Sequence, residues 1–306
     1  MTKMLYISDS HLRKPEDNAF RALLKSIEAV VEMDEVEALM LGGDISDFTD
    51  GFRRVLTDLS NGLFSGIPIL VVSGNHDVWE QYWKHNHKDT GHIFFKEMPK
   101  ICNSLDNVYW MEGEVKQFDN WLIAGTMGWY DYSSKREGPD GIKTMDDNFF
   151  HYNKAGHSAD ARFAHFSLKD VELSNLLRRN LLAAIDREID KPGVDNLAVF
   201  THVPMFPIDI TWKPMDYHWN LGCQYFYNLT LGDELLLYEK LKLTISGHTH
   251  FGREELLSKN PYNGYFQHLV SYGDYGYPEA FELDLLYDGS VQYRRIGMNS
   301  RFDLKE

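Results

Sequence analysis

Five short apolar runs along the chain each end in polar residues that can bind a metal ion or take part in catalysis. The run at residues 36–41 is almost unbroken and leads through Gly42 and Gly43 to Asp44. A continuous apolar run that stops at glycine is typical of a buried parallel strand that turns into a loop. The other four runs end in the same way: 5–8 before Asp9 and His11, 69–73 before Asn75, His76 and Asp77, 197–201 before His202, and 243–246 before His248 and His250.

Helical periodicity separates several of these runs. Apolar residues at helical spacing predict helices at about 17–32, with Asp17 as a cap, at about 51–63 and at 168–189. The alternation of strand and helix predicts right-handed crossovers and a mainly parallel sheet, hence an α/β fold. Because parallel sheets bind ligands at the carboxyl ends of their strands, we expect the five polar tips to converge on one place.

Other parts of the chain have a less regular pattern. Short alternating runs at 108–110, 115–117 and 122–124 predict antiparallel strands, with a turn between the first two. Segments 265–271, 281–286 and 291–294 predict strands that close a second sheet. Three excursions at about 79–95, 129–167 and 205–230, rich in aromatic residues, leave the core. We interpret them as pocket walls of a single domain spanning 1–306, although a packed surface insertion explains each of them equally well.

Composition excludes some partners. The 31 Lys and Arg residues against 46 Asp and Glu residues give a net charge of −15, which disfavours nucleic acids and anionic membrane surfaces. The two cysteines, Cys102 and Cys223, argue against a disulfide framework and for a reducing compartment. We see no signal-peptide pattern and no apolar run of the roughly 18 residues that a membrane span needs. The expected location is therefore cytoplasmic.

The residue types at the tips indicate a metal centre. In Asp9-x-His11 and His248-x-His250, extended backbone points both side chains of each pair to one face. Carboxylate, amide and imidazole ligands together suit Mn, Fe, Zn or Co. The potential ligands are Asp9, His11, Asp44, Asn75, His202, His248 and His250. They are too many for one ion and suit two ions that share a carboxylate, for which Asp44 is the natural bridge.

The ordered set of tips resembles a known family. Asp9-Ser10-His11, Gly43-Asp44, Gly74-Asn75-His76-Asp77, Thr201-His202 and Gly247-His248-Thr249-His250 occur in this order between residue 4 and about residue 252. The set resembles the calcineurin-like metallophosphoesterase superfamily, and the order makes the match far more specific than any single short motif. The resemblance implies a four-layer α/β/β/α sandwich, that is, two mixed sheets flanked by helices.

The resemblance also implies roles for individual residues. Two divalent or trivalent metal ions (Mn, Fe, Zn or Co, with Mn expected to serve in vitro) would be bound. Asp9, His11, Asp44 and His250 would hold one ion, and Asp44, Asn75, His202 and His248 the other. His76 would donate a proton to the leaving oxygen. We expect Asp77 to orient the His76 imidazole and to raise the pKa of His76, because a nearby carboxylate favours the charged form.

These expectations describe a phosphoesterase that works by attack of a metal-bound hydroxide on phosphorus. A protonated His76 would assist a poor alkoxide leaving group, which favours phosphodiesters over phosphomonoesters. The alternatives are a phosphomonoesterase or protein Ser/Thr phosphatase, a nuclease of the same superfamily, and a non-catalytic interaction module. The net charge ranks nucleic acid below a small or nucleotide-like phosphoester. Candidates for a phosphate clamp are Arg136, Arg162 and Arg253, with a surface salt bridge as the preferred reading for each. The oligomeric state is left open.

Overall fold

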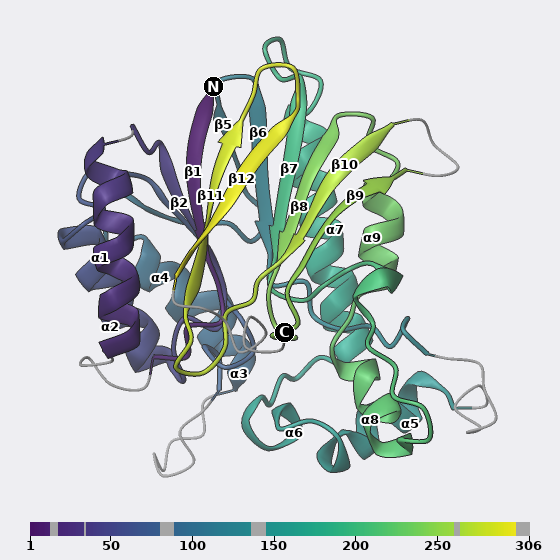
Figure 1. The fold of residues 1–306 in the computed structure, drawn as a ribbon. Coiled ribbons are helices and arrows are strands. Elements are labelled where there is room, and N and C mark those ends of the chain that lie inside the picture. Colours follow the sequence, from purple (N-terminus) through teal and green to yellow (C-terminus); the bar gives the residue numbers. More distant parts are fainter. Residues whose placement is uncertain (13–17, 34, 80–88, 136–144, 260–263, 298–306) are drawn as a thin grey trace.

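Two six-stranded sheets pack face to face in the computed structural model, with helices on their outer faces (Figure 1). The structure describes residues 1–12, 18–33, 35–79, 89–135, 145–259 and 264–297. The predicted cap Asp17, the candidate Arg136 and residues 80–88 of the first excursion lie outside these residues. The arrangement is the predicted α/β/β/α sandwich.

The first sheet contains the first three predicted tips side by side. In spatial order its strands are β12 (Val291–Gly297), β11 (Glu279–Leu285), β1 (Thr2–Ile7), β2 (Ala38–Gly42), β3 (Ile69–Val72) and β4 (Val108–Trp110). Strands β1 to β4 run parallel, and β11 runs antiparallel to both β1 and β12. The carboxyl ends of β1, β2 and β3 therefore meet at one edge, as predicted.

The second sheet contains the other two tips. In spatial order its strands are β5 (Val115–Phe118), β6 (Trp121–Thr126), β7 (Asn196–Thr201), β8 (Leu241–Ser246), β10 (Tyr265–Val270) and β9 (Arg253–Ser258). Strands β6, β7, β8 and β10 are parallel, whereas β5 and β9 are antiparallel edge strands. The tips of β7 and β8 are neighbours in this sheet.

Two predictions about strand pairing were wrong. The expected antiparallel pair of β4 with β5 does not exist, because β4 pairs with β3 in the first sheet and β5 pairs with β6 in the second. The C-terminal strands do not all close the second sheet, because β11 pairs with β1 and takes β12 into the first. Alternating apolar residues predict a strand but carry no information on which sheet buries it.

Helices cover the outer face of each sheet. The first sheet is covered by α1 (Asn18–Met33), α2 (Thr49–Asn61) and α4 (Met98–Cys102), and the second by α7 (Asp170–Glu188) and α9 (Leu229–Leu235) (Figure 1). Leu23 of α1 and Leu56 of α2 pack in one core cluster with Leu5 and Leu39. The predicted helices correspond to α1, α2 and α7. Among the described residues, no helix has the length and apolarity that crossing a membrane requires.

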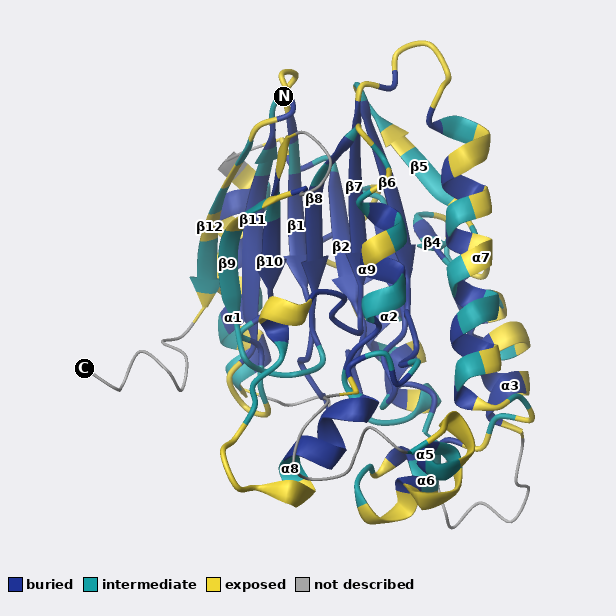
Figure 2. Ribbon diagram, turned by 90° about the vertical axis from the view of Figure 1, so that its right-hand side faces the viewer, coloured by how far each residue is buried: buried dark blue, intermediate teal, exposed yellow. Residues whose placement is uncertain are grey.

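Strand alternation divides the core into layers. Leu5 and Ile7 of β1 face the helices, whereas Met4 and Tyr6 face the second sheet, as the two-residue period of a strand requires. The central strands are buried on both faces and are dark blue in Figure 2. The strand ends are therefore held rigidly, which gives the polar tips a fixed frame.

The described parts of the three excursions contain short helices and helical turns. They form α3 (Thr90–His92), the π-helical turn η1 (Ile93–Glu97), α5 (Asp147–Asn153), the 3₁₀ turn η3 (Lys154–Gly156), α6 (Asp160–Phe163), the 3₁₀ turn η4 (Pro207–Asp209), α8 (Tyr217–Gly222) and the 3₁₀ turn η5 (Cys223–Tyr225). Helices α5, α6 and α8 lie together at the carboxyl ends of the parallel strands (Figures 1 and 2). These excursions thus lie beside the polar tips.

Candidate metal centre

The five tips converge between the two sheets. Hydrogen bonds link neighbouring tips, from Asp9 N to Gly43 O at 3.0 Å and from Gly247 N to His202 O at 3.0 Å. A third bond, from His248 N to Asp9 Oδ1 at 2.8 Å, joins the β8 tip of the second sheet to the β1 tip of the first. The structure thus brings all seven predicted ligands together.

The backbone at the tips is unusual. Five of the predicted ligands have a positive φ, which residues with a side chain rarely adopt. They are Asp9 (57°), His11 (44°), Asp44 (48°), His248 (72°) and His250 (57°). Such a conformation costs roughly 1–3 kcal/mol per residue and clusters at functional sites. Here it turns the side chains at the ends of β1, β2 and β8 toward one another.

Two glycines make room for the carboxylates. A Cβ atom on Gly74 would lie 2.1 Å from Asp44 Oδ1, and one on Gly247 would lie 2.2 Å from Asp9 Oδ2. Neither distance is possible between non-bonded atoms, so no larger residue fits at these positions without displacing a carboxylate.

The first group of ligands is Asp9, His11 and His250, whose ligand atoms all lie within 4.8 Å of one another. Asp9 Oδ2 and both ring nitrogens of His11 are buried and have no hydrogen-bond partner among the described residues. His250 Nδ1 lies 3.1 Å from Asp274 Oδ1, which leaves Nε2 for a ligand. Buried polar atoms without partners are costly, so this group fits a metal ion as its missing partner.

The second group is Asp44, His202 and His248, with Asn75 beside them. Asn75 Oδ1 lies 3.0 Å from His202 Nε2 and 3.1 Å from His248 Nδ1. The opposite ring nitrogens are occupied by carbonyl oxygens: His202 Nδ1 lies 3.0 Å from Gly42 O, and His248 Nε2 lies 3.3 Å from Tyr225 O. Such carbonyls fix the tautomer, so the nitrogens that face the group are the ones free to bind an ion.

Asp44 lies between the two groups. Its Oδ1 accepts a hydrogen bond from His76 N at 2.8 Å. Its Oδ2 lies 3.4 Å from His202 Nε2 and 3.7 Å from His11 Nε2, one nitrogen from each group. One carboxylate oxygen of Asp44 is therefore within 4 Å of a histidine from each group.

Electrostatics at the centre favour an ionised Asp44. Burial disfavours charge on this carboxyl, but the nearby imidazoles, His202 foremost, hold the pKa of Asp44 well below its ordinary value. Burial and the charge of His202 together lower the pKa of His248 to about 3, so His248 is neutral at pH 7. An ionised carboxylate and a neutral imidazole are the forms that bind metal ions. Because Asp44, against the effect of burial, raises the pKa of His202 to about 9, an ion at this group would displace a proton from His202.

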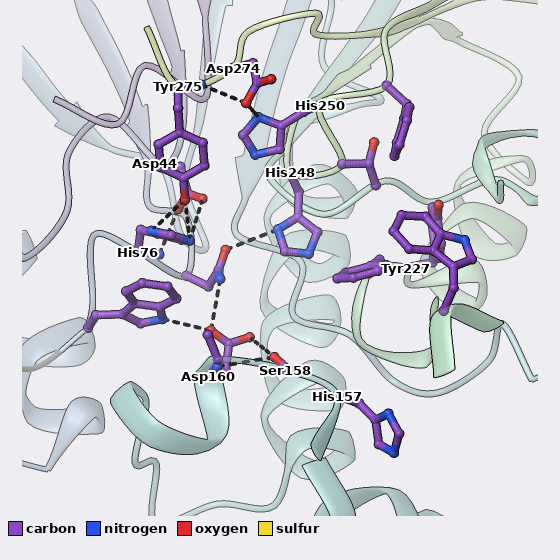
Figure 3. A pocket seen from close by; sticks show the side chains of 17 residues that line it. Asp44, His76, His157, Ser158, Asp160, Tyr227, His248, His250, Asp274 and Tyr275 are labelled. Carbon is purple, nitrogen blue, oxygen red and sulfur yellow. Dashed lines mark hydrogen bonds and ion pairs between the residues drawn. The ribbon is translucent and has the colours of Figure 1, made fainter. Parts of the chain in front are cut away.

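His76 lies at the edge of the centre with both ring nitrogens engaged (Figure 3). Its Nδ1 is 2.9 Å from Asp47 Oδ1. Its Nε2 is 4.0 Å from Asp44 Oδ2 and 3.3 Å from the hydroxyl of Tyr275. The Trp79 ring stacks on the imidazole, with centroids 3.5 Å apart.

Asp77 has a different environment from the one predicted. Its carboxylate accepts hydrogen bonds from Gly74 N at 2.9 Å and Ser46 N at 2.9 Å, and none of the described hydrogen bonds joins it to His76. Burial and the charge of Asp44 raise the pKa of Asp77. The structure therefore places Asp77 as a brace between two tip loops. The carboxylate beside the imidazole is that of Asp47, which the sequence analysis did not select.

A pocket of 530 Å³ opens over the centre. Trp79 and Tyr275 line it on the side of His76, and Trp219, Phe226 and Phe251 line another part. Phe226 packs against the imidazole of His248, with centroids 5.6 Å apart. Residues of all three excursions line this pocket, among them Trp79, Asp160 and Trp219.

Two of the three arginine candidates do not line this pocket. Neither Arg162 nor Arg253 is among the described residues that line it. Arg253 Nε lies 3.5 Å from Asp209 Oδ1, and Arg253 Nη1 lies 3.7 Å from Glu255 Oε1. For Arg253 the geometry agrees with the salt-bridge reading.

The fold is a sandwich of two mixed sheets, and the candidate metal-binding residues lie at the ends of strands from both sheets. The family model for calcineurin-like phosphoesterases matches residues 2–252 of this chain, and the chain belongs to that family. Its members are phosphoester hydrolases with dinuclear metal centres.

Solved structures share the fold at low sequence identity. The phosphopantetheinyl hydrolase of Mycobacterium tuberculosis has a TM-score of 0.61 at 15% identity, with 90% of this chain and 91% of that chain covered. The TT1561 protein of Thermus thermophilus has a TM-score of 0.53 at 11% identity, with coverage of 96% and 98%. No curated protein sequence matches the chain.

Proposed function

We propose that this protein hydrolyses a phosphodiester at a centre of two metal ions that share Asp44. Asp9, His11 and His250 would complete one site, and Asn75, His202 and His248 the other. The two ions, when bound, would neutralise charge on the phosphate and activate a water molecule. The buried unpartnered atoms of Asp9 and His11 support the first site, and the facing nitrogens of His202 and His248 support the second.

His76 is the proposed proton donor to the leaving oxygen. Its Nδ1 is engaged by the Asp47 carboxylate, so its Nε2, which contacts the Tyr275 hydroxyl in the pocket wall, is the nitrogen proposed to meet a substrate. The carboxylate of Asp47 would stabilise the imidazolium and hold the ring in place. An alkoxide is a poor leaving group and gains most from such a donor.

The single observation that carries the diester proposal is the pair of aromatic walls near the two metal groups. Trp79 and Tyr275 lie beside His76, whereas Phe226 lies against His248. Figure 3 shows His76 and Tyr275 on one side of His248 and Tyr227 on the other. A phosphodiester carries two organic groups, so one wall would contact the leaving group and the other the group that stays on phosphorus.

The test compares wild type with His76→Asn after loading with Mn²⁺, on diesters with an alkyl or a 4-nitrophenyl leaving group. We expect kcat on the alkyl diester to fall roughly 10²- to 10³-fold in the variant. The loss on the nitrophenyl diester should be much smaller, because nitrophenolate leaves without a proton. Metal content, measured on both proteins, should be two ions per chain.

Three results would argue against the proposal. Equal losses on both diesters would remove the acid role of His76. Cleavage of phosphomonoesters alone would replace the diester with a monoester. Two bound ions without cleavage of any ester would favour a binding module.

A further inference from the structure

Asp160 is a buried carboxylate that reaches the metal centre from an excursion. It is the first residue of α6, is 1% exposed, and lies 85 positions along the chain from Asn75. Its Oδ1 accepts hydrogen bonds from Asn75 Nδ2 at 2.9 Å and from Trp79 Nε1 at 2.8 Å. Figure 3 shows Asp160 below the centre with these bonds drawn as dashed lines.

The second carboxylate oxygen is also bonded. Oδ2 accepts hydrogen bonds from Ser158 Oγ at 3.1 Å and from Tyr130 OH at 3.3 Å. No Lys or Arg forms an ion pair with Asp160 among the described residues, so four neutral donors solvate this carboxylate. A buried charge requires such donors, and removing the carboxylate would leave all four without their partner.

The contact with Asn75 fixes which end of the amide faces the metal group. The Oδ1 atom of Asp160 also accepts the indole N–H of Trp79, so it acts as an acceptor, and the amide turns its donor, Nδ2, toward it. The Oδ1 atom of Asn75 then faces His202 Nε2 and His248 Nδ1, as observed. In the reverse orientation the amide nitrogen, which has no lone pair to donate, would face the ion.

Through Trp79, Asp160 is also linked to His76, the proposed proton donor. The same Asp160 oxygen holds the indole N–H, and the indole stacks on His76 with an interplanar angle of 28°. A single carboxylate thus contacts a metal-ligand candidate and the ring that packs on the proton donor.

From these contacts we infer that Asp160 is a positioning residue of the second metal site, which it serves by orienting the Asn75 amide. The inference rests on the proposed two-metal centre. It gives the excursion at 129–167 a part in metal binding in addition to its part in the pocket wall.

Mn²⁺ binding to the full-length protein, measured by calorimetry and by metal content after dialysis, tests the inference. Asp160→Ala should bind the first ion as wild type does and the second ion about 10- to 100-fold more weakly. Asp160→Asn keeps an oxygen that can accept from Asn75, so it should regain most of the affinity. The matched control is Asp170→Asn, because Asp170 is a buried acid next to Lys154 that contacts neither Asn75 nor Trp79.

Wild-type affinity for both ions in Asp160→Ala would overturn the inference while leaving the two-metal centre intact. An equal loss in Asp170→Asn would overturn it too, because destabilisation would then explain the effect. A wild-type protein that binds fewer than two ions would instead refute the proposed centre.

A second pair of variants decides the question if Asp160→Ala does not fold. Asn75→Asp alone sets two carboxylates against each other at hydrogen-bond distance. Adding Asp160→Asn reverses the hydrogen bond, since the amide introduced at 160 can donate to the carboxylate introduced at 75. The double variant should therefore bind the second ion more tightly than Asn75→Asp, and weaker binding would overturn the inference.

Discussion

Two buried clusters of aspartate and histidine in this molecule differ in how their polar atoms are paired. In the tip cluster, defined by the seven predicted ligands, Asp9 Oδ2 and both His11 nitrogens lack hydrogen-bond partners. In the outer cluster, defined as Thr244, Asp209 and His268, each ring nitrogen of the histidine is paired. His268 Nδ1 lies 2.9 Å from Thr244 Oγ1, and His268 Nε2 lies 2.9 Å from Asp209 Oδ1.

The backbone of the two clusters differs as well. Thr244 and His268 are opposite one another in the regular parallel pairing of β8 with β10, and neither has a positive φ. Five of the seven tip residues do. Residue type alone therefore does not distinguish a metal centre from a structural network. In the tip cluster, buried atoms without a hydrogen-bond partner and a left-handed backbone occur at the same residues, Asp9 and His11, and this combination fits a missing ligand.

The largest effect on activity is expected from a substitution in the tip cluster. Asp44→Asn removes the charge of the shared carboxylate, so the protein should bind fewer than two ions and lose roughly 10⁴-fold in kcat/KM. Metal analysis and steady-state kinetics on a diester measure both effects. His268→Ala in the outer cluster is the control and should retain two ions. Two ions in Asp44→Asn would contradict a shared carboxylate.

The next effect concerns the carboxylate beside His76. Asp47→Asn should lower kcat roughly 10- to 100-fold on an alkyl diester, because the imidazolium loses its stabilising charge. Asp50→Asn, on the exposed side of α2, is the comparison and should change kcat little. The leaving group separates this role from a structural one. The loss in Asp47→Asn should be much smaller on a 4-nitrophenyl diester, which leaves without a proton, and equal losses on both diesters would count against the role.

The outer cluster should affect stability and not metal binding. His268→Ala leaves Thr244 and Asp209 without their buried partner, which should lower the free energy of unfolding by about 2 kcal/mol. Urea unfolding of the metal-free protein measures this change, and Mn²⁺ titration checks that both sites remain. A loss of metal affinity in His268→Ala would show that the two clusters are coupled and would remove the distinction drawn between them.

The smallest effect involves a carboxyl in neither cluster. Burial raises the pKa of Glu112 to about 7. Hydrogen bonds from Thr126 and from the backbone N–H of Met127 lower this pKa but do not offset the effect of burial. The folded protein then keeps a proton that the unfolded chain releases from about pH 4.5, so stability falls as the pH rises through 7. Glu112→Gln lacks this titration. As the pH rises from 5 to 8, the stability of Glu112→Gln relative to wild type should therefore increase in urea unfolding, and a constant difference would contradict the raised pKa.

The metal-ligand candidates could be predicted from the sequence because each one directly follows a buried strand. The end of an apolar run locates a tip, and parallel strands bring their tips together, so Asp44 and Asn75 could be placed without any long-range information. Long helices were equally accessible, since the apolar stripe of α7 repeats over several turns. The sheet that each of β4, β5, β11 and β12 joins depends on distant partners, which no local pattern records.

Residues that act from neighbouring loops were harder to find. Asp77 is adjacent to His76 in the chain, yet its carboxylate turns back to Gly74 N. Asp47 lies 29 positions from His76 and nevertheless contacts its Nδ1. Its one signal is its position three residues after Asp44 on the same tip. Asp160 and Tyr275 carry no such signal, because the folding of distant segments brings them to the centre.

Asp160 also limits how the protein could be redesigned. Aromatic walls carried by excursions invite loop grafting, in which one segment is exchanged to change the substrate while the strand tips stay untouched. Here the excursion at 129–167 contains Asp160, whose carboxylate accepts the hydrogen bond from the Asn75 amide. A transplanted loop without a carboxylate at that position would leave the Asn75 amide without its acceptor, and with the proposed two-metal centre it would weaken the second site as well as change the pocket.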